Sequence, residues 1–142
     1  MAVSGADRFT IEFPGDSLYL STVRLFTSAV VRHFRTDEDT IGDVKVAVSE
    51  ACAAFIRGEQ AEGSIQVAAV PAAGMLTIEV TSPDLSLAVP PQRMAEVDTP
   101  TPSRMAAELG LELISSLFEG AEVVSEGPPA IRFSVPLAGT AA

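Results

Sequence analysis

The sequence predicts an α/β protein, a two-layer sandwich in which one mixed, mostly antiparallel sheet is covered on one face by three helices. Two observations carry this prediction. Segments with the helical period and one apolar side interrupt short β-rich runs, and most of these runs come as consecutive pairs that can form hairpins. In addition, 142 residues with 47% apolar side chains suffice for one domain with its own core.

The N-terminal part is expected to hold one strand and one helix. Phe9–Phe13 alternates apolar and polar residues, which indicates a half-buried strand. A Pro-Gly pair ends that strand, and Asp16 or Ser17 can cap the helix that follows. The helix is expected to run to about Arg35, and its apolar residues form a broad surface.

A second, central helix is expected over Thr40–Arg57, where Thr40 and Asp43 have the form of a capping box. Its apolar residues recur at three- and four-residue steps and therefore share one face, formed by Ile41, Val44, Val48, Ala51, Cys52 and Phe55. The opposite side carries Asp43, Glu50, Ala54 and Arg57. That side can form the wall of a site only if the rest of the chain supplies partners for it.

A hairpin and a long loop are expected after the central helix. Ser64–Ala72 and Met75–Ser82 are β-rich runs joined by Ala73-Gly74. Residues 83–103 hold five of the ten prolines, which excludes a regular element over most of their length. A loop of this length inside a compact domain is typical of a lid, a binding loop or a disordered segment.

A third helix and a second hairpin are expected to complete a single domain over 9–137, between a flexible N-terminus (1–8) and a disordered tail (138–142). The helix begins at Ser103, carries apolar residues spaced by four, and ends at Gly120; these residues are Met105, Leu109, Leu113 and Leu117. The strands of the hairpin are Ala121–Ser125 and Ala130–Leu137.

Composition excludes several classes of function. A net charge of −10 repels phosphate backbones, so we expect no direct nucleic-acid binding. The single cysteine, Cys52, excludes an internal disulfide and is expected to be a buried thiol. His33 has no second metal-type ligand at a useful spacing, so no metal site is expected. No apolar run is long enough for a membrane span, and no signal pattern is present, which favours the cytoplasm.

The motifs of the chain resemble those of a known superfamily. The run AVSEACAAFIR (47–57) resembles the N-box helix of the histidine-kinase-like ATPase (GHKL) superfamily, and is most similar to the RsbW-type anti-sigma factors, which double as serine kinases. The RsbW-type group includes the sporulation anti-sigma factor, which has a strand motif and a sigma-contacting arginine. In this chain Glu12-Phe13 and Arg24 have the same spacing to Glu50 as those two features. GLELISSLFEGAEV (110–123) resembles the family's GLGL-helix-strand close. The resemblance implies the histidine-kinase-like ATPase fold.

The resemblance also implies roles for single residues. Glu50 matches the glutamate that acts as base, and Ala54 takes the place of the asparagine that holds Mg²⁺. Ser82 lies roughly where the adenine-reading aspartate belongs, and Asp84 is the nearest carboxylate. Glu108 replaces the first glycine of GLGL, while Gly110 and Leu111 remain.

These departures predict degenerate nucleotide-binding positions at Ala54, Ser82, Asp84, Gly110 and Leu111. We expect no cofactor, with ATP or ADP and Mg²⁺ as the alternative. Simpler interpretations stay open: Glu50 and Arg24 are then ordinary surface residues, and Gly110 merely allows close helix packing.

The predicted function is therefore that of an anti-sigma-like regulator. It is expected to sequester a sigma factor or related regulator through its sheet edge and first two helices, with Arg24 pairing with a carboxylate of the partner. An anti-sigma antagonist would release the partner by competing for this surface. The enzyme alternative is an active RsbW-like serine kinase that phosphorylates such an antagonist, with Glu50 as base and Asp84 reading adenine. A third option is a structural partner subunit of a true kinase. The resemblance also implies a homodimer.

Overall fold

The computed structural model describes residues 7–35, 37–56, 63–85, 87, 102–124 and 128–137, apart from the side chains of residues 103 and 104. The elements in chain order are β1 (Phe9–Pro14), the short 3-10 helix η1 (Ser17–Tyr19), α1 (Leu20–Arg32), α2 (Glu38–Ile56), β2 (Ser64–Ala72), β3 (Met75–Thr81), α3 (Pro102–Leu117), β4 (Glu122–Val124) and β5 (Ala130–Pro136). The predicted flexible N-terminus, lid-like loop and disordered tail lie wholly or mostly outside the described residues.

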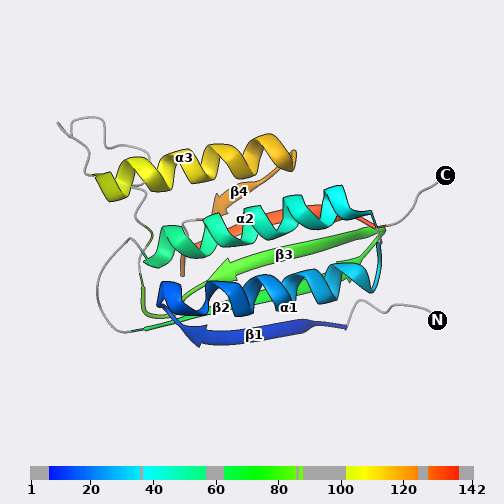
Figure 1. Ribbon diagram of the computed structural model, residues 1–142, viewed down its shortest axis with the longest axis horizontal. Helices are drawn as coiled ribbons and strands as arrows, with labels where there is room; N and C mark the ends of the chain where they lie inside the picture. Colours follow the sequence, from blue (N-terminus) through cyan, green and yellow to red (C-terminus); the bar gives the residue numbers. More distant parts are fainter. Residues whose placement is uncertain are drawn as a thin grey trace.

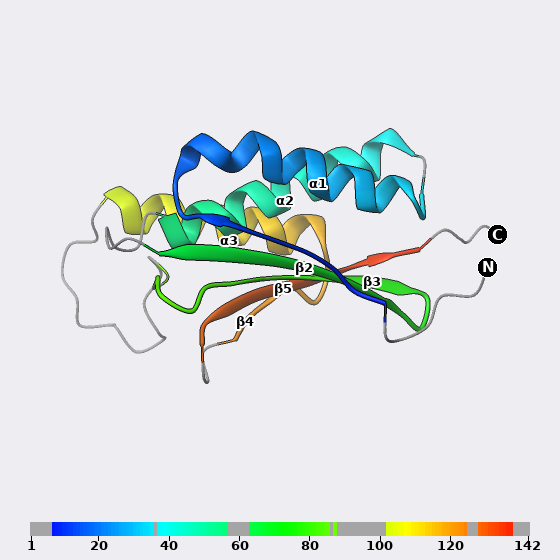
Figure 2. The same cartoon turned by 90° about the horizontal axis from the view of Figure 1, so that it is seen from below.

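The strands form one five-stranded sheet in the order β1-β2-β3-β5-β4, and each pairing of neighbours is antiparallel. The three helices lie together on one face of this sheet, so the molecule has two layers (Figure 2). The predicted α/β sandwich is confirmed. The sheet was expected to be mixed, but the described strands contain only antiparallel pairs. The two helices between β1 and β2 bring the chain back to the end of β1, where Ser64 pairs with Pro14, so β2 runs antiparallel to β1.

The hairpin of β2 and β3 forms where the sequence predicts it. Ala73 (φ 55°) and Gly74 (φ 78°) both adopt the left-handed conformation that tight two-residue hairpin turns require. Along β3, Leu76, Ile78 and Val80 are fully buried, whereas the residues between them are half-buried. This alternation directs every second side chain toward the helices, as expected for a sheet covered on one face.

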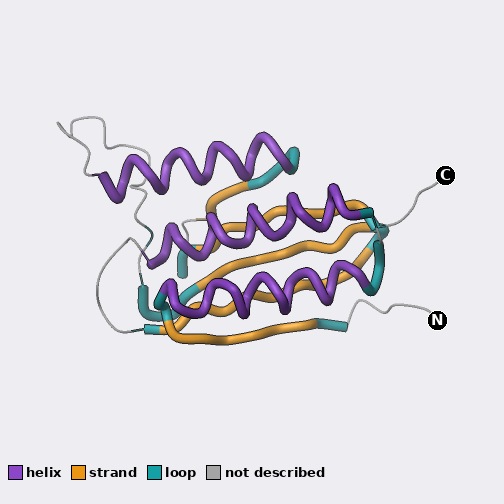
Figure 3. The backbone as a smooth tube through the Cα atoms, in the orientation of Figure 1, coloured by secondary structure: helices purple, strands orange, loops and turns teal. Residues whose placement is uncertain are grey.

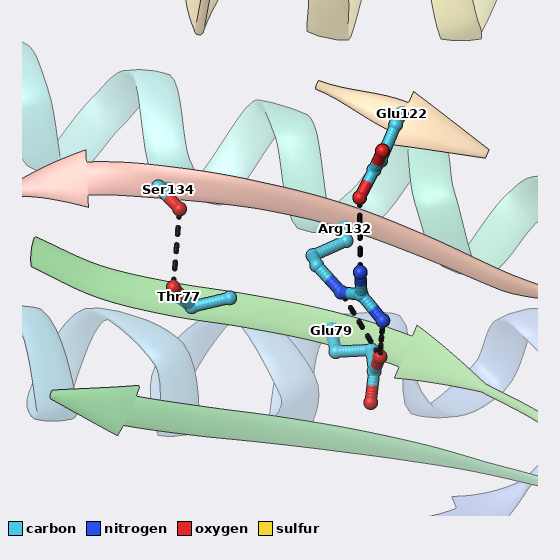
Figure 4. Close-up of polar contacts among 5 residues, drawn as sticks. All are labelled: Thr77, Glu79, Glu122, Arg132 and Ser134. Carbon is cyan, nitrogen blue, oxygen red and sulfur yellow. Dashed lines mark hydrogen bonds and ion pairs between the residues drawn. The ribbon is translucent and has the colours of Figure 1, made fainter. Parts of the chain in front are cut away.

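The face of the sheet away from the helices carries polar ties between strands (Figure 4). The Arg132 guanidinium donates to the Glu79 carboxylate, with an Nη2–Oε2 distance of 2.7 Å, and to the Glu122 carboxylate, with an Nη1–Oε2 distance of 2.9 Å. Thr77 and Ser134 share a hydrogen bond across β3 and β5. These cross-strand pairs link β3, β5 and the short edge strand β4.

Helix α2 lies between α1 and α3 in the helical layer (Figures 1 and 3). The six residues predicted to share its apolar face are all buried at 1% exposure or less. Burial in this face raises the pKa of the Cys52 thiol to about 12, so the thiol is protonated and unreactive. In the described part of the chain, no helix is long and apolar enough to cross a membrane.

Helix α2 begins two residues earlier than predicted, at Glu38, and its cap is Asp37, not Thr40. The Asp37 carboxylate accepts a hydrogen bond from the Thr40 backbone N–H at 3.2 Å and another from Arg35 Nε at 2.7 Å. A carboxylate is a better acceptor than a threonine hydroxyl and suits the positive end of the helix dipole. The same bonds hold the pKa of Asp37 well below its ordinary value.

Helix α3 shows the main departure from the predicted packing. Met105, Leu109 and Leu113, which mark the four-residue spacing in the sequence, are 49%, 64% and 39% exposed. The buried face of α3 is formed by Ala107, Gly110 and Ile114, and Phe118 continues it directly after the helix ends. Phe118 stacks on Phe133 of β5, which fixes this end of the helix on the sheet, and Gly120 (φ 85°) then turns the chain toward β4.

Candidate functional site

The side of α2 that the sequence marks as a site wall is divided between its two neighbouring helices. Ser49 lies toward α1, where its hydroxyl accepts a hydrogen bond from Arg24 Nη1 at 2.9 Å. Glu50 is half-buried and faces α3, where it lies against Gly110. Ala54, expected on the open side, is only 1% exposed. This side of α2 is therefore covered and not open, in line with the contact between α2 and α3, and the place of Ala54 among the nucleotide positions stays a prediction.

Helices α2 and α3 approach closely at Glu50 and Gly110, and both Ala54 of α2 and Ala107 of α3 are 1% exposed. A Cβ atom added at Gly110 would overlap Glu50 Oε1 and come within 3.4 Å of Glu50 Cβ. Gly110 therefore permits a close approach of the two helices. This is the interpretation that the sequence left open beside the phosphate-binding one.

Gly110 and Leu111 lie in the middle of α3, which runs from Pro102 to Leu117. Backbone N–H groups in the interior of a helix are bonded to carbonyls one turn earlier, so they are not available to a phosphate. Leu111 is half-buried and packs against the core. The family pattern places glycines at the start of this helix, and the eight residues from Pro102 to Leu109 are helical here instead.

At the end of β3, Ser82 is 1% exposed and organises the turn that follows. Its hydroxyl donates to the Ser64 carbonyl at 2.6 Å and accepts from the backbone N–H groups of Asp84 at 3.1 Å and Leu85 at 2.8 Å. Asp84 is exposed, and its carboxylate accepts from the Ser64 N–H at 3.2 Å. Ser82, at the expected position of the adenine-reading aspartate, and Asp84, the nearest carboxylate, thus tie the end of β3 to the start of β2.

Leu85 fills the space between this turn and two glycines. It is 4% exposed, and a Cβ at Gly15 would lie 2.5 Å from Leu85 Cδ1. A Cβ at Gly63 would lie 2.6 Å from Asp84 Cβ and 3.0 Å from Leu85. The Gly15 N–H donates to the Gly63 carbonyl at 2.9 Å. The turn is therefore packed tightly against the ends of β1 and β2.

The described residues do not fit a magnesium-bound triphosphate in this arrangement. Ala54, at the position predicted for the metal ligand, is buried and has no side-chain oxygen, and Gly110 is inside a helix. The Ser82 hydroxyl already has three partners. Among the described residues there is no cluster of three histidine, cysteine, aspartate or glutamate side chains that suits a metal ion.

The side of α2 that faces α1 is open, and Glu50 lies at the boundary between the two sides, because it contacts Gly110 of α3 and also lines this open side. A hollow of about 400 Å³, here called the α1–α2 hollow, is lined by Arg24, Gly42, Lys45, Val46, Ser49 and Glu50. Gly42 has no atom within 4 Å of the place where a Cβ would stand, so nothing in the described structure fills this point. Val46 is 41% exposed and supplies an apolar patch beside the polar groups.

The α1–α2 hollow gathers two cations and one carboxylate in a chain whose net charge is −10. Lys45 is the only lysine of the sequence, and Arg24 is held at the hollow by its bond to Ser49. The arrangement is suited to bind an acidic group, because two cations beside a partly apolar surface favour a desolvated carboxylate. Of its lining residues, only Arg24 and Glu50 were singled out from the sequence.

Gly42, Lys45 and Ser49 were missed, although the sequence contains a signal for them. Together with Val46 they follow the three- and four-residue steps of one helical stripe, and this stripe includes a glycine and the sole lysine. These residues line a hollow only because Arg24 of α1 lies across from them.

The chain was compared with known proteins. The family model described as "Histidine kinase-like ATPase domain" matches residues 13–132. No curated protein matches the chain.

A similar solved structure is that of the RsbU and RsbW domains of Rv1364c from Mycobacterium tuberculosis. The two are 18% identical, with a TM-score of 0.68 over 96% of this chain. The chain spans about a third (34%) of the length of that structure. The likeness supports the fold.

Proposed function

The chain belongs to the histidine kinase-like ATPase domain family, and on this premise we propose that it is an RsbW-like regulator that sequesters a sigma factor or a related protein. The observation that carries the proposal is the contrast between the two sides of α2. The positions that would hold a nucleotide are occupied by internal contacts, whereas the α1–α2 hollow is open and lined by Arg24 and Lys45. The similarity to a structure that contains an RsbW domain supports this choice of partner class.

Binding would work by burying the α1–α2 hollow under the partner. A partner carboxylate would pair with the Arg24 guanidinium, which Ser49 holds in place, and Lys45 would add a second cation. An apolar side chain of the partner would cover Val46. Because the rest of the chain is acidic, its field would orient a partner that presents basic regions around its acidic contact.

Release would come from a competing anti-sigma antagonist that covers the same residues. This mechanism requires no phosphorylation by the chain itself. We propose a cytoplasmic homodimer as the working form, because RsbW-like subunits usually pair. Light scattering of the purified chain tests the dimer, and a monomer at all concentrations would contradict it.

The test of sequestration is a binding titration against the sigma factors and antagonist-like proteins of the host. We expect Arg24→Ala to weaken binding at least tenfold, equivalent to ~1.4 kcal/mol, and Lys45→Ala to weaken it less. Arg32→Ala is the matched control, since Arg32 is an α1 arginine that pairs with Glu38 away from the hollow. If no candidate binds, or if both arginine variants behave alike, the proposal fails.

An active serine kinase is the second candidate function, because Glu50 also lines the α1–α2 hollow and family membership is compatible with nucleotide binding. Calorimetry with ATP and ADP, with and without Mg²⁺, separates the two candidates. Micromolar binding that weakens in Glu50→Gln or Asp84→Asn would favour the kinase. Absence of binding would leave sequestration as the function.

A further inference from the structure

Helix α3 carries an exposed apolar stripe on the side opposite its packed face. The stripe consists of Met105, Leu109 and Leu113, which follow one another at four-residue steps and are 49%, 64% and 39% exposed. Single exposed apolar residues are common on proteins and need no explanation, but three in one continuous row are not. Eight residues of helix separate the ends of the row, so it is about 12 Å long.

The packing of α3 explains why these large residues are outside. The helix approaches α2 and the sheet through Ala107, Gly110 and Ile114, and two of these three are small. At Gly110 the Glu50 carboxylate occupies the space that a larger side chain would need. The stripe is not part of the core cluster that the described residues form.

The charges beside the stripe indicate what kind of partner fits it. At about 100° per residue, Glu108 and Glu112 fall along one flank of the stripe. Glu112 is exposed, and so is Glu119 in the turn that directly follows α3. Between residues 105 and 119 the sequence has no lysine or arginine. A second copy of this chain would bring the same acidic flank against itself, so charge disfavours self-association through α3.

We propose that the α3 stripe is a second docking surface, which binds an amphipathic helix whose apolar residues are flanked by lysine or arginine. Leucine-like side chains of the partner pack along Met105, Leu109 and Leu113, while its cations face Glu112 and Glu119. This surface differs in chemistry from the α1–α2 hollow, which gathers cations for an acidic group. The inference goes beyond sequestration and does not depend on it.

The test uses a synthetic helical peptide of about 14 residues, with leucines at three- and four-residue steps and lysines beside them. The chain has four methionines, and Met105 is in the stripe while Met75 is on β3. With ¹³C-methyl-labelled methionine, the peptide should shift the Met105 signal and leave that of Met75 unchanged. A peptide with glutamate in place of lysine should shift neither.

Affinity measurements on variants localise the binding. We expect Leu109→Ser with Leu113→Ser to weaken peptide binding at least tenfold, and Glu112→Gln with Glu119→Gln to weaken it and reduce its dependence on salt. Leu25→Ser is the matched control, because Leu25 is 70% exposed on α1, and it should bind as the wild type does. Arg24→Ala should also bind normally, which separates this test from that of the proposed function.

Several outcomes overturn the inference. They are a peptide that does not bind, equal binding of the acidic peptide, a Met105 signal that does not move, or unchanged affinity in the Leu109 and Leu113 double variant. A dimer that Leu109→Ser dissociates in sedimentation would instead assign the stripe to a second copy. Because the substituted residues are exposed, thermal unfolding should confirm that all variants remain folded.

Discussion

The two sides of α2 differ in how they are packed, although Ser49 on one side and Glu50 on the other are neighbours in the sequence. On the side that faces α3, Gly110 lies against Glu50, and Ala54 and Gly110, two of the predicted nucleotide positions, are buried. On the side of Ser49, α1 brings the long side chain of Arg24, and a hollow remains. The comparison teaches that the neighbouring helix, as much as the residues of α2 itself, decides whether a helical face becomes a site.

The largest expected effect concerns the turn after β3, where Ser82 and Asp84, two of the predicted nucleotide positions, make internal contacts. Leu85→Ala should lower the free energy of unfolding by about 2–5 kcal/mol, because it removes a buried side chain that packs between Gly15 and Gly63 and leaves a cavity. Urea denaturation measures the change. The control is Leu25→Ala, an exposed leucine that should change stability by less than about 0.5 kcal/mol. Equal effects of the two variants would show that the turn after β3 is not packed.

A second prediction tests the α2–α3 interface directly. Gly110→Leu should destabilise the fold by about 1–3 kcal/mol, since the added side chain meets Glu50 and forces the two helices apart. Gly42→Ala is the matched control in α2, where a Cβ meets open space; replacing this helical glycine should stabilise by roughly 0.5–1 kcal/mol. Thermal unfolding of both variants shows whether the two sides of α2 differ as described.

A third prediction separates a structural from a nucleotide-reading role of Ser82. Ser82→Ala should cost about 1–2 kcal/mol, because the buried N–H groups of Asp84 and Leu85 lose their acceptor. Chemical denaturation gives the value, and calorimetry with ATP gives the comparison. A variant with unchanged stability but altered nucleotide binding would contradict the structural role and would favour the kinase.

Much of the fold was predictable because local patterns and tertiary packing agree there. The alternation of β3, the left-handed pair Ala73-Gly74 and the apolar face of α2 each depend on residues that are close in the sequence. These signals needed no knowledge of the partner element. They gave the order of helices and strands and the two-layer architecture.

The candidate site was harder to predict because it depends on which helix lies beside which. The spacing of Met105, Leu109 and Leu113 indicates an apolar face of α3, but small residues on another face allow closer packing and decide the orientation. For the same reason Ala54 is buried by α3 and not open, and Lys45 reaches a hollow that exists only beside Arg24. The roles of Glu50 and Arg24 remain predictions.

The smallest expected effect is at the first turn of α2, which both sides share. The Arg35 and Thr40 bonds lower the pKa of Asp37, so its contribution to stability is present above the ordinary pKa of 3.8 and is lost as the pH falls through and below that value. Asp37→Asn can keep the capping bond but has no charge to titrate. Between about pH 6 and pH 2 the wild type should therefore lose stability more steeply than the variant, as measured by urea midpoints. The cap serves the whole helix. Gly110→Leu and Gly42→Ala should therefore differ in unfolding free energy by the same amount with Asp37 or with Asn at position 37. A changed difference would mean that the two sides of α2 are coupled through its N-terminus.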